Sequence, residues 1–236
     1  YVLEYFLFTT YLSLALKAEK AGIDSIMVDW EEAGKIERQI GKGLETTCDT
    51  IEDLRTLSSN LKIPVSVRIN ALGDQTQSEV DTALNNGAKN IMLTMAHTIK
   101  EVKEFLKIMD KRAKTIIQIE TPSLVKELDD FKDLDWDYAY IGLNDLMVAS
   151  GRHNIWEAIA DGTTAEICNH LRGRKYGFGG STVIGGGDPI CGALILHEQV
   201  RLGVSMSLMR STFKSYLMDR DLITEMQLIR AFVECS

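Results

Sequence analysis

The stretch AYIGLNDLMVASGR, residues 139–152, contains a short apolar run that ends in Gly-Leu-Asn-Asp and then becomes polar. A short apolar run between turn signals is typical of a buried strand. A buried strand that delivers a carboxylate, here Asp145, at its end is typical of a parallel sheet, in which functional groups lie at the carboxyl ends of the strands.

The same alternation of apolar strands and amphipathic helices recurs along the chain. Helical stretches with one apolar face, such as the stripe of Val102, Phe105 and Met109, separate the strands. This alternation predicts an α/β protein that forms a closed (β/α)₈ TIM barrel. An open doubly wound sheet is the alternative, but FTTYLS, residues 8–13, lacks the glycine-rich turn that would follow its first strand. The eight predicted strands are residues 3–8, 25–29, 64–69, 90–95, 115–120, 138–143, 175–180 and 205–209.

We predict one domain over residues 1–236, because the chain has only three prolines and no linker-like segment. A C-terminal helix is predicted over residues 214–234, and it could pack on its own barrel or on a neighbouring subunit. Long connections at residues 30–63 and 144–174 are of the kind that often carry function or oligomer contacts. The apolar stripe of the last helix consists of Leu222, Met226, Ile229 and Val233.

Composition excludes several classes of protein. With 45% hydrophobic and 25% charged residues, the chain resembles an ordinary globular protein, and its net charge of -8 argues against a general nucleic-acid binder. No run approaches the roughly 20 apolar residues of a membrane span. The four cysteines are far apart, which favours reduced thiols over a zinc site or disulfides. We therefore expect a cytoplasmic protein that binds neither nucleic acid nor a membrane.

Polar residues recur at the carboxyl end of successive predicted strands. In a barrel these ends meet at one face, where active sites lie. The sequence thus predicts a small-molecule site that combines acidic groups with arginine. Its candidate residues, in chain order, are Asp29, Glu31, Glu32, Arg68, Asn70, Glu120, Asn144, Asp145 and Arg210.

Glu120 and Asp145 follow adjacent strands and offer hard oxygen ligands, which suit Mg²⁺ or Mn²⁺ rather than zinc. A divalent ion there would polarise the keto group of a 2-oxo acid and stabilise its enolate. Arg68 suits the keto or enolate oxygen, or a substrate carboxylate. Each residue also has a structural interpretation: the two carboxylates could cap helices, and Arg68 could be an ion-pair partner in the acidic rim.

These motifs resemble a known family. AGIDSIMVDWE (21–31), VRIN (67–70), IQIETP (117–122) and IGLNDL (141–146) are similar to the HpcH/HpaI aldolase and citrate lyase beta-subunit family of pyruvate barrels. The resemblance implies a divalent-metal-dependent class II aldolase or lyase that makes or breaks a C–C bond next to a pyruvate-type enolate. It also implies a homo-oligomer that acts on a small 2-oxo acid or hydroxy-oxo acid.

The resemblance also assigns roles to residues. Glu120 and Asp145 are implied as ligands of Mg²⁺ or Mn²⁺, and Arg68 as the substrate-binding arginine. The backbone N–H groups of Asn144 and Asp145 are implied to receive the substrate carboxylate, and we place the preceding Gly142 in the same substrate-binding set.

The chain departs from the family pattern after the second strand. Aldolases of the family carry a histidine base in D-x-E-H, whereas this chain has DWEE, with Glu32 at that position. We therefore predict Glu32 as a candidate base and Asp29 as a second catalytic carboxylate beside Arg68. Asp29 and Glu31 could instead orient Arg68. Three alternative functions stay open: an acyl-CoA thioester lyase or hydrolase of the citrate lyase beta type, a phosphotransferase of the same superfamily, and a non-catalytic barrel relative.

The segment GFGGSTVIGGGDP, residues 177–189, looks like a phosphate loop, and TIM barrels often bind phosphate after their last two strands. It lacks the lysine and the spacing of a P-loop. We interpret its glycines as residues that let the loop turn over the barrel rim.

Overall fold

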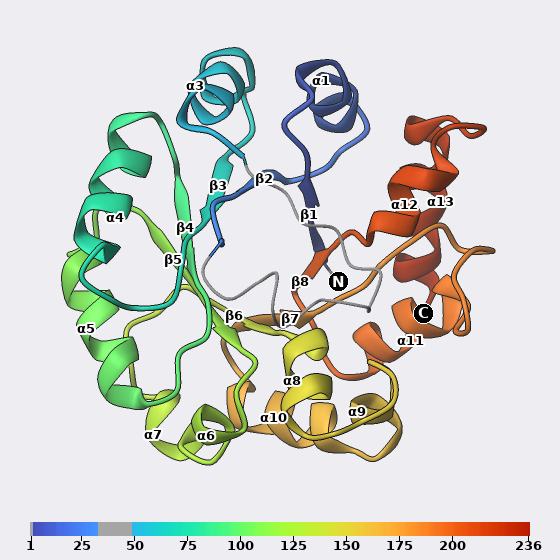
Figure 1. The fold of residues 1–236 in the computed structure, drawn as a ribbon. Coiled ribbons are helices and arrows are strands. Elements are labelled where there is room, and N and C mark those ends of the chain that lie inside the picture. The colour runs from blue at the N-terminus through green and yellow to red at the C-terminus, as the bar shows by residue number, and fades with distance from the viewer. Residues whose placement is uncertain (1, 33–48) are drawn as a thin grey trace.

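The structure is a computed structural model that describes residues 2–32 and 49–236 (Figure 1). Its eight parallel strands form a closed barrel in sequence order, and β8 pairs with β1 through Glu4 and Met206. The predicted TIM barrel is confirmed, and each predicted strand is present within one or two residues of its expected ends. The strands are β1 (Glu4–Phe8), β2 (Ser25–Asp29), β3 (Val65–Arg68), β4 (Asn90–Leu93), β5 (Lys114–Ile119), β6 (Tyr138–Ile141), β7 (Lys175–Phe178) and β8 (Met206–Leu208).

Helices surround the barrel (Figure 1). The predicted connection 144–174 contains three short helices, α8 to α10. Residues 33–48, in the predicted connection 30–63, lie outside the described residues. The described helices are α1 (Leu12–Lys20), α3 (Ile51–Asn60), α4 (Thr76–Asn85), α5 (Ile99–Met109), α6 (Pro122–Val125), α7 (Leu128–Phe131), α8 (Leu143–Ala149), α9 (Glu157–Ala160), α10 (Thr163–Leu171), α11 (Gly192–Arg201), α12 (Ser211–Tyr216) and α13 (Leu222–Cys235).

The alternation of side chains along each strand separates two apolar layers. On β1, Tyr5 and Leu7 belong to the large cluster packed under the helices, whereas Phe6 belongs to the smaller cluster that fills the barrel. Successive side chains of a strand point to opposite faces, so the inward row continues every second residue. At the strand ends these inward rows reach polar residues. The buried members of the smaller cluster are Phe6, Met27, Met92, Ile116, Tyr138, Tyr140, Met206 and Leu208.

The predicted C-terminal helix over residues 214–234 is wrong in its bounds. The segment forms α12 and α13, and Asp221 begins the second helix by accepting a hydrogen bond from the backbone N–H of Thr224 at 2.9 Å. A side-chain cap of this kind satisfies an N–H group at a new helix start. Helix α13 lies against α1 and α11 of its own barrel, and its predicted stripe of Leu222, Met226, Ile229 and Val233 is buried.

The structure also bears on the predictions about membrane spans and cysteines. No helix in the described part of the chain is both long and apolar enough to cross a membrane. Within residues 2–32 and 49–236, Cys168, Cys191 and Cys235 are free thiols, while Cys48 lies outside the described residues.

Candidate active site

A cavity of about 240 Å³ lies at the carboxyl ends of the strands. It lies where the apolar filling of the barrel stops, and the inward rows of several strands end there in polar side chains. Most of the predicted site residues meet in it. Those that line it are Asp29, Arg68, Gly142, Asn144, Asp145 and Arg210.

Arg68, at the end of β3, is held by carboxylates from β2 and the loop after it. Its Nε donates to Asp29 Oδ1 at 2.9 Å and its Nη2 to Asp29 Oδ2 at 2.7 Å, and Nη2 lies 3.4 Å from Glu31 Oε2. The guanidinium carbon lies 4.9 Å from the centroid of the Phe8 ring. Burial opposes its charge, but the hydrogen bond and charge of Asp29, then the charges of Glu31 and Glu120, raise the pKa of Arg68. Among the contacts of the described residues, none engages its Nη1 group.

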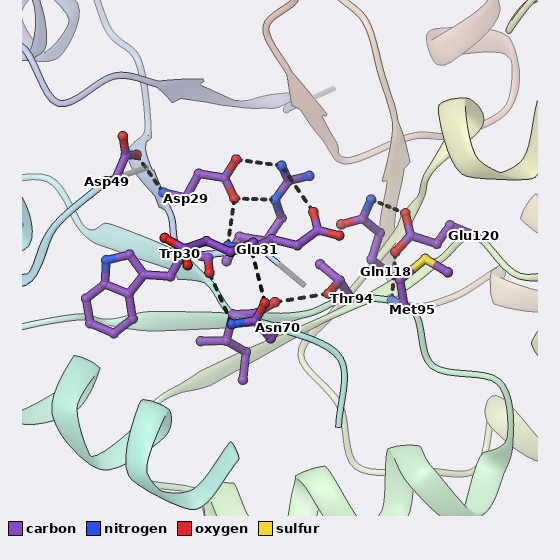
Figure 2. Close-up of polar contacts among 12 residues, drawn as sticks. Asp29, Trp30, Glu31, Asp49, Asn70, Thr94, Met95, Gln118 and Glu120 are labelled. Atoms are coloured by element: carbon purple, nitrogen blue, oxygen red, sulfur yellow. Dashed lines mark hydrogen bonds and ion pairs between the residues drawn. The ribbon is translucent and has the colours of Figure 1, made fainter. Parts of the chain in front are cut away.

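The carboxylates that hold Arg68 are themselves fixed, as Figure 2 shows. The backbone N–H of Asp29 donates to Asp49 Oδ2 at 2.7 Å, and that of Glu31 donates to Asp29 Oδ1 at 3.2 Å. Both side chains are almost fully buried. The contacts expected for Asp29 and Glu31 as residues that orient Arg68 are therefore present.

Replacing Asp29 with Asn should lower kcat/KM by about 10- to 100-fold, a typical effect of losing a residue that orients a site residue. The amide is nearly isosteric, but it removes one charge and turns one acceptor of the Arg68 fork into a donor. Steady-state kinetics on the wild type, Asp29→Asn and Glu31→Gln would test this. We expect Glu31→Gln, which loses only the longer contact, to have the smaller effect; equal kinetics for Asp29→Asn and the wild type would contradict an orienting role.

Glu120 lies just after β5 with its carboxylate buried inside the barrel mouth. Its Oε1 accepts the backbone N–H of Met95 at 2.7 Å and its Oε2 accepts Gln118 Nε2 at 2.5 Å (Figure 2). Met95 directs this N–H with a left-handed backbone φ of 51°, which is uncommon for a residue other than glycine. Burial, followed by the charge of Asp145, raises the pKa of Glu120 well above its ordinary value.

The turn after β6 packs directly against Glu120. A Cβ on Gly142 would lie 2.6 Å from Glu120 Oε2 and 2.8 Å from Gln118 Nε2, so only glycine fits at this position. Helix α8 begins at Leu143, which places Asn144 and Asp145 in its first turn. Backbone N–H groups in the first turn of a helix have no acceptor within the helix. The predicted substrate-binding residues thus share one turn with the predicted metal ligand Asp145.

Glu32 differs from the other predicted site residues. Its side chain is exposed, and it does not line the cavity formed by the described residues. Its backbone N–H donates to Asn70 Oδ1 at 2.9 Å. Asn70 also donates to the Trp30 carbonyl at 3.2 Å and to Glu79 Oε1 at 2.5 Å, which ties the loop after β2 to α4. The catalytic role of Glu32 stays a prediction.

The cavity also contains residues that the sequence did not single out. Gln118 lies two positions before Glu120, so the period of two along β5 is a signal that could have identified it. Phe8 and Tyr140 continue the inward rows of β1 and β6 in the same way. Lys214 of α12 also lines the cavity, and no local signal identifies it because its position depends on how α12 lies against the barrel.

Glu120 and Asp145 offer carboxylate oxygens, the ligands that a divalent cation such as Mg²⁺ prefers. No group of three or more His, Cys, Asp or Glu side chains suited to a metal occurs in the described ranges. Mg²⁺ is usually held by one or two carboxylates, and water and substrate oxygens complete its shell. Two observations fit a cation held by Glu120 and Asp145. The negative charge of Asp145 raises the pKa of Glu120, and the buried Gln118 Oε1 has no hydrogen-bond partner. A cation beside the two carboxylates would offset this repulsion.

The fold is that of an α/β-barrel protein, with a cavity at the carboxyl ends of its strands that both acidic and basic side chains line. The family model described as HpcH/HpaI aldolase/citrate lyase matches residues 4–158. The chain belongs to this family, as its motifs predicted. No curated protein matches the chain by sequence.

Solved structures show the same fold at low sequence identity. The HpcH/HpaI aldolase from Desulfitobacterium hafniense DCB-2 aligns with a TM-score of 0.69 and 16% identity, over 92% of this chain and 90% of that one. RipC from Yersinia pestis aligns with a TM-score of 0.61 and 14% identity, over 96% and 94%. A mutant tryptophan synthase alpha-subunit from Pyrococcus furiosus aligns with a TM-score of 0.61 and 12% identity, over 99% and 96%.

Proposed function

We propose that this protein is a divalent-metal-dependent class II aldolase or lyase that cleaves or forms a C–C bond through the enolate of a pyruvate-type 2-oxo acid. The observation that carries the proposal is that Arg68 and Asp145 line one cavity at the barrel mouth, and that the buried carboxylate of Glu120 lies close enough to interact with the charges of both. Family membership supports a lyase, since the family model describes aldolases and citrate lyase. The cavity, about 240 Å³, suits a small substrate.

In this proposal Glu120 and Asp145 hold Mg²⁺ or Mn²⁺. The bound ion would supply Lewis-acid polarisation of the substrate keto group. Arg68, kept cationic by its carboxylate partners, donates from its Nη1 group to the keto or enolate oxygen. The backbone N–H groups of Asn144 and Asp145 receive the substrate carboxylate. The site thereby stabilises the negative charge that develops on the 2-oxo acid fragment as the C–C bond breaks.

Asp29 and Glu32 are the two carboxylates that were predicted as catalytic beside Arg68. Asp29 uses both oxygens to bind Arg68, so we assign it an orienting role in the reaction. Glu32, in the position of the family histidine, is exposed and anchored through its backbone to Asn70. We propose that Glu32, or a water molecule, removes the proton from the hydroxyl group next to the breaking bond and returns a proton to the enolate.

Deuterium exchange into the C3 methyl group of pyruvate tests this function before the aldehyde is known. Exchange would be followed by NMR in D₂O with Mg²⁺ or Mn²⁺, and then with EDTA. We expect exchange that requires both protein and metal, against a metal-only control for the spontaneous reaction. If the protein binds metal tightly but gives no exchange above this control, the proposal is wrong, and a thioester substrate or a non-catalytic role becomes the better interpretation.

A further inference from the structure

A second arginine lies in the cavity at a position that the proposed enolate chemistry does not use. Arg210 follows β8, where Met206 and Leu208 belong to the apolar filling of the barrel. The period of two along the strand continues this inward row to Arg210, and the residue lines the cavity together with Ser211. Its backbone is fixed, because its N–H donates to the Ser181 carbonyl at 2.9 Å.

The Arg210 side chain is packed between Trp156 and Gly180. Its guanidinium carbon lies 5.0 Å from the centroid of the Trp156 ring, which is buried in the connection after β6. A Cβ on Gly180 would lie 2.0 Å from Arg210 Cγ and 2.4 Å from Cδ, so the missing side chain at Gly180 is what leaves room for the arginine stem. The structure therefore fixes the direction of this side chain from both sides.

The hydrogen-bonding capacity of Arg210 is incompletely used. Its Nη1 is buried and has no hydrogen-bond partner, and across residues 2–32 and 49–236 the side chain forms no ion pair. Buried polar groups are normally hydrogen-bonded, so an orphaned guanidinium nitrogen on a residue that lines a cavity indicates a missing acceptor. Burial lowers the pKa of Arg210, although the charges of Asp188 and Tyr216 oppose this effect. Arg68 differs, because Asp29 and Glu31 already compensate its charge.

We propose that Arg210 is a specificity-determining residue that binds an anionic oxygen group, carboxylate or phosphate, at the end of the substrate distant from the 2-oxo acid. The inference rests on the proposed function, which places the 2-oxo acid end at Arg68, Glu120 and Asp145. A guanidinium fork offers two parallel donors that match either anion. The partner that the enzyme adds to or releases from the enolate is then itself an acid.

The affinity for 2-oxo acids with and without a distal anion tests the role of Arg210 and requires no turnover. Titration calorimetry with Mg²⁺ present would compare 2-oxoglutarate and 2-oxoadipate with 2-oxopentanoate and 2-oxohexanoate, which have the same chain lengths but no distal carboxylate. A 2-oxo acid of matched length that ends in a phosphonate distinguishes a phosphate site from a carboxylate site. We expect the wild type to favour an acid with a distal anion by about 10- to 100-fold, as for a hydrogen-bonded charge pair.

Variants show whether Arg210 causes this preference. In Arg210→Gln the preference should fall to about one, and Arg210→Lys should keep part of it because it keeps the charge without the fork. Arg172→Gln, an exposed arginine bonded to Asn169 outside the cavity, is the matched control and should keep the full preference. Thermal unfolding of each variant separates misfolding from a binding defect.

Two outcomes would overturn the assignment: equal affinity of the wild type for acids with and without the distal anion, or a preference that survives Arg210→Gln. Neither depends on catalysis. Pyruvate has no distal group, so a failure of its deuterium exchange counts against the enolate chemistry alone, whereas the absence of a distal-anion preference in the wild type counts against Arg210 alone.

Discussion

Replacing Glu120 with Gln is expected to abolish metal-dependent deuterium exchange into pyruvate, with a loss of about a thousandfold or more. The reason is that a bound metal contributes several kcal/mol to the stabilisation of developing charge, and each 1.36 kcal/mol corresponds to a factor of ten in rate. The amide keeps the size of the side chain and can still accept the Met95 N–H, but it has no charge for the cation. NMR exchange rates with saturating Mg²⁺ would measure the loss.

The melting temperature of Glu120→Gln, measured with and without Mg²⁺, distinguishes a metal ligand from a helix cap. Mg²⁺ should raise the melting temperature of the wild type, because a ligand that binds only the folded state stabilises it. Glu120→Gln should show no such rise, and Asp145→Asn should behave in the same way. Glu127→Gln is the matched control, since Glu127 Oε2 also accepts a backbone N–H, that of Ile99 at 2.6 Å, but Glu127 is not one of the predicted metal ligands. If Glu120→Gln still responds to Mg²⁺ like the wild type, the two carboxylates are not its ligands.

Replacing Gly177 with Ala should destabilise the barrel by about 3 kcal/mol or more, a large part of the stability of a typical domain. Gly177 lies in β7 and pairs with Met206 of β8. A Cβ there would lie 1.8 Å from the backbone oxygen of Met206 and 2.7 Å from its Cγ. Because the nearest obstacle is backbone, no rotamer change relieves the clash, and the two strands would have to separate.

Urea denaturation followed by circular dichroism would measure this change. The control is Gly185→Ala in the following loop, where a Cβ would meet nothing within 4 Å. This control should alter the free energy of unfolding by no more than about 0.5 kcal/mol, like an ordinary surface substitution. If Gly177→Ala unfolds at the same urea concentration as the control, the packing between β7 and β8 is looser than the structure describes.

Local sequence signals predicted the fold well because they are periodic. Strands such as SIMVD at residues 25–29 coincide with the structure, since a run of buried β-branched and apolar residues between turn signals has few other stable arrangements. Helix boundaries were less well predicted. The apolar stripe of the last helix suggested one helix from residue 214, but the cap at Asp221 divides the segment into α12 and α13.

Some features of the candidate site were likewise predictable from the sequence, and others were not. Asp29, Arg68, Glu120 and Asp145 were predicted from the sequence alone, because each lies at or shortly after the carboxyl end of an apolar strand and parallel strands bring these ends to one face. Arg210 was visible at a strand end, but its packing on Trp156 and the orphaned Nη1 involve residues far apart in the chain.

The sequence by itself determined the barrel, the face that carries the cavity and the family, since these follow from periodicity and from motifs within short segments. Only the tertiary structure decided which charges are compensated. The register of β2 against β3 brings Asp29 onto Arg68, and the course of the connection after β6 brings Trp156 against Arg210. Electrostatic and packing energies depend on distances between atoms in space, which separation along the chain does not fix.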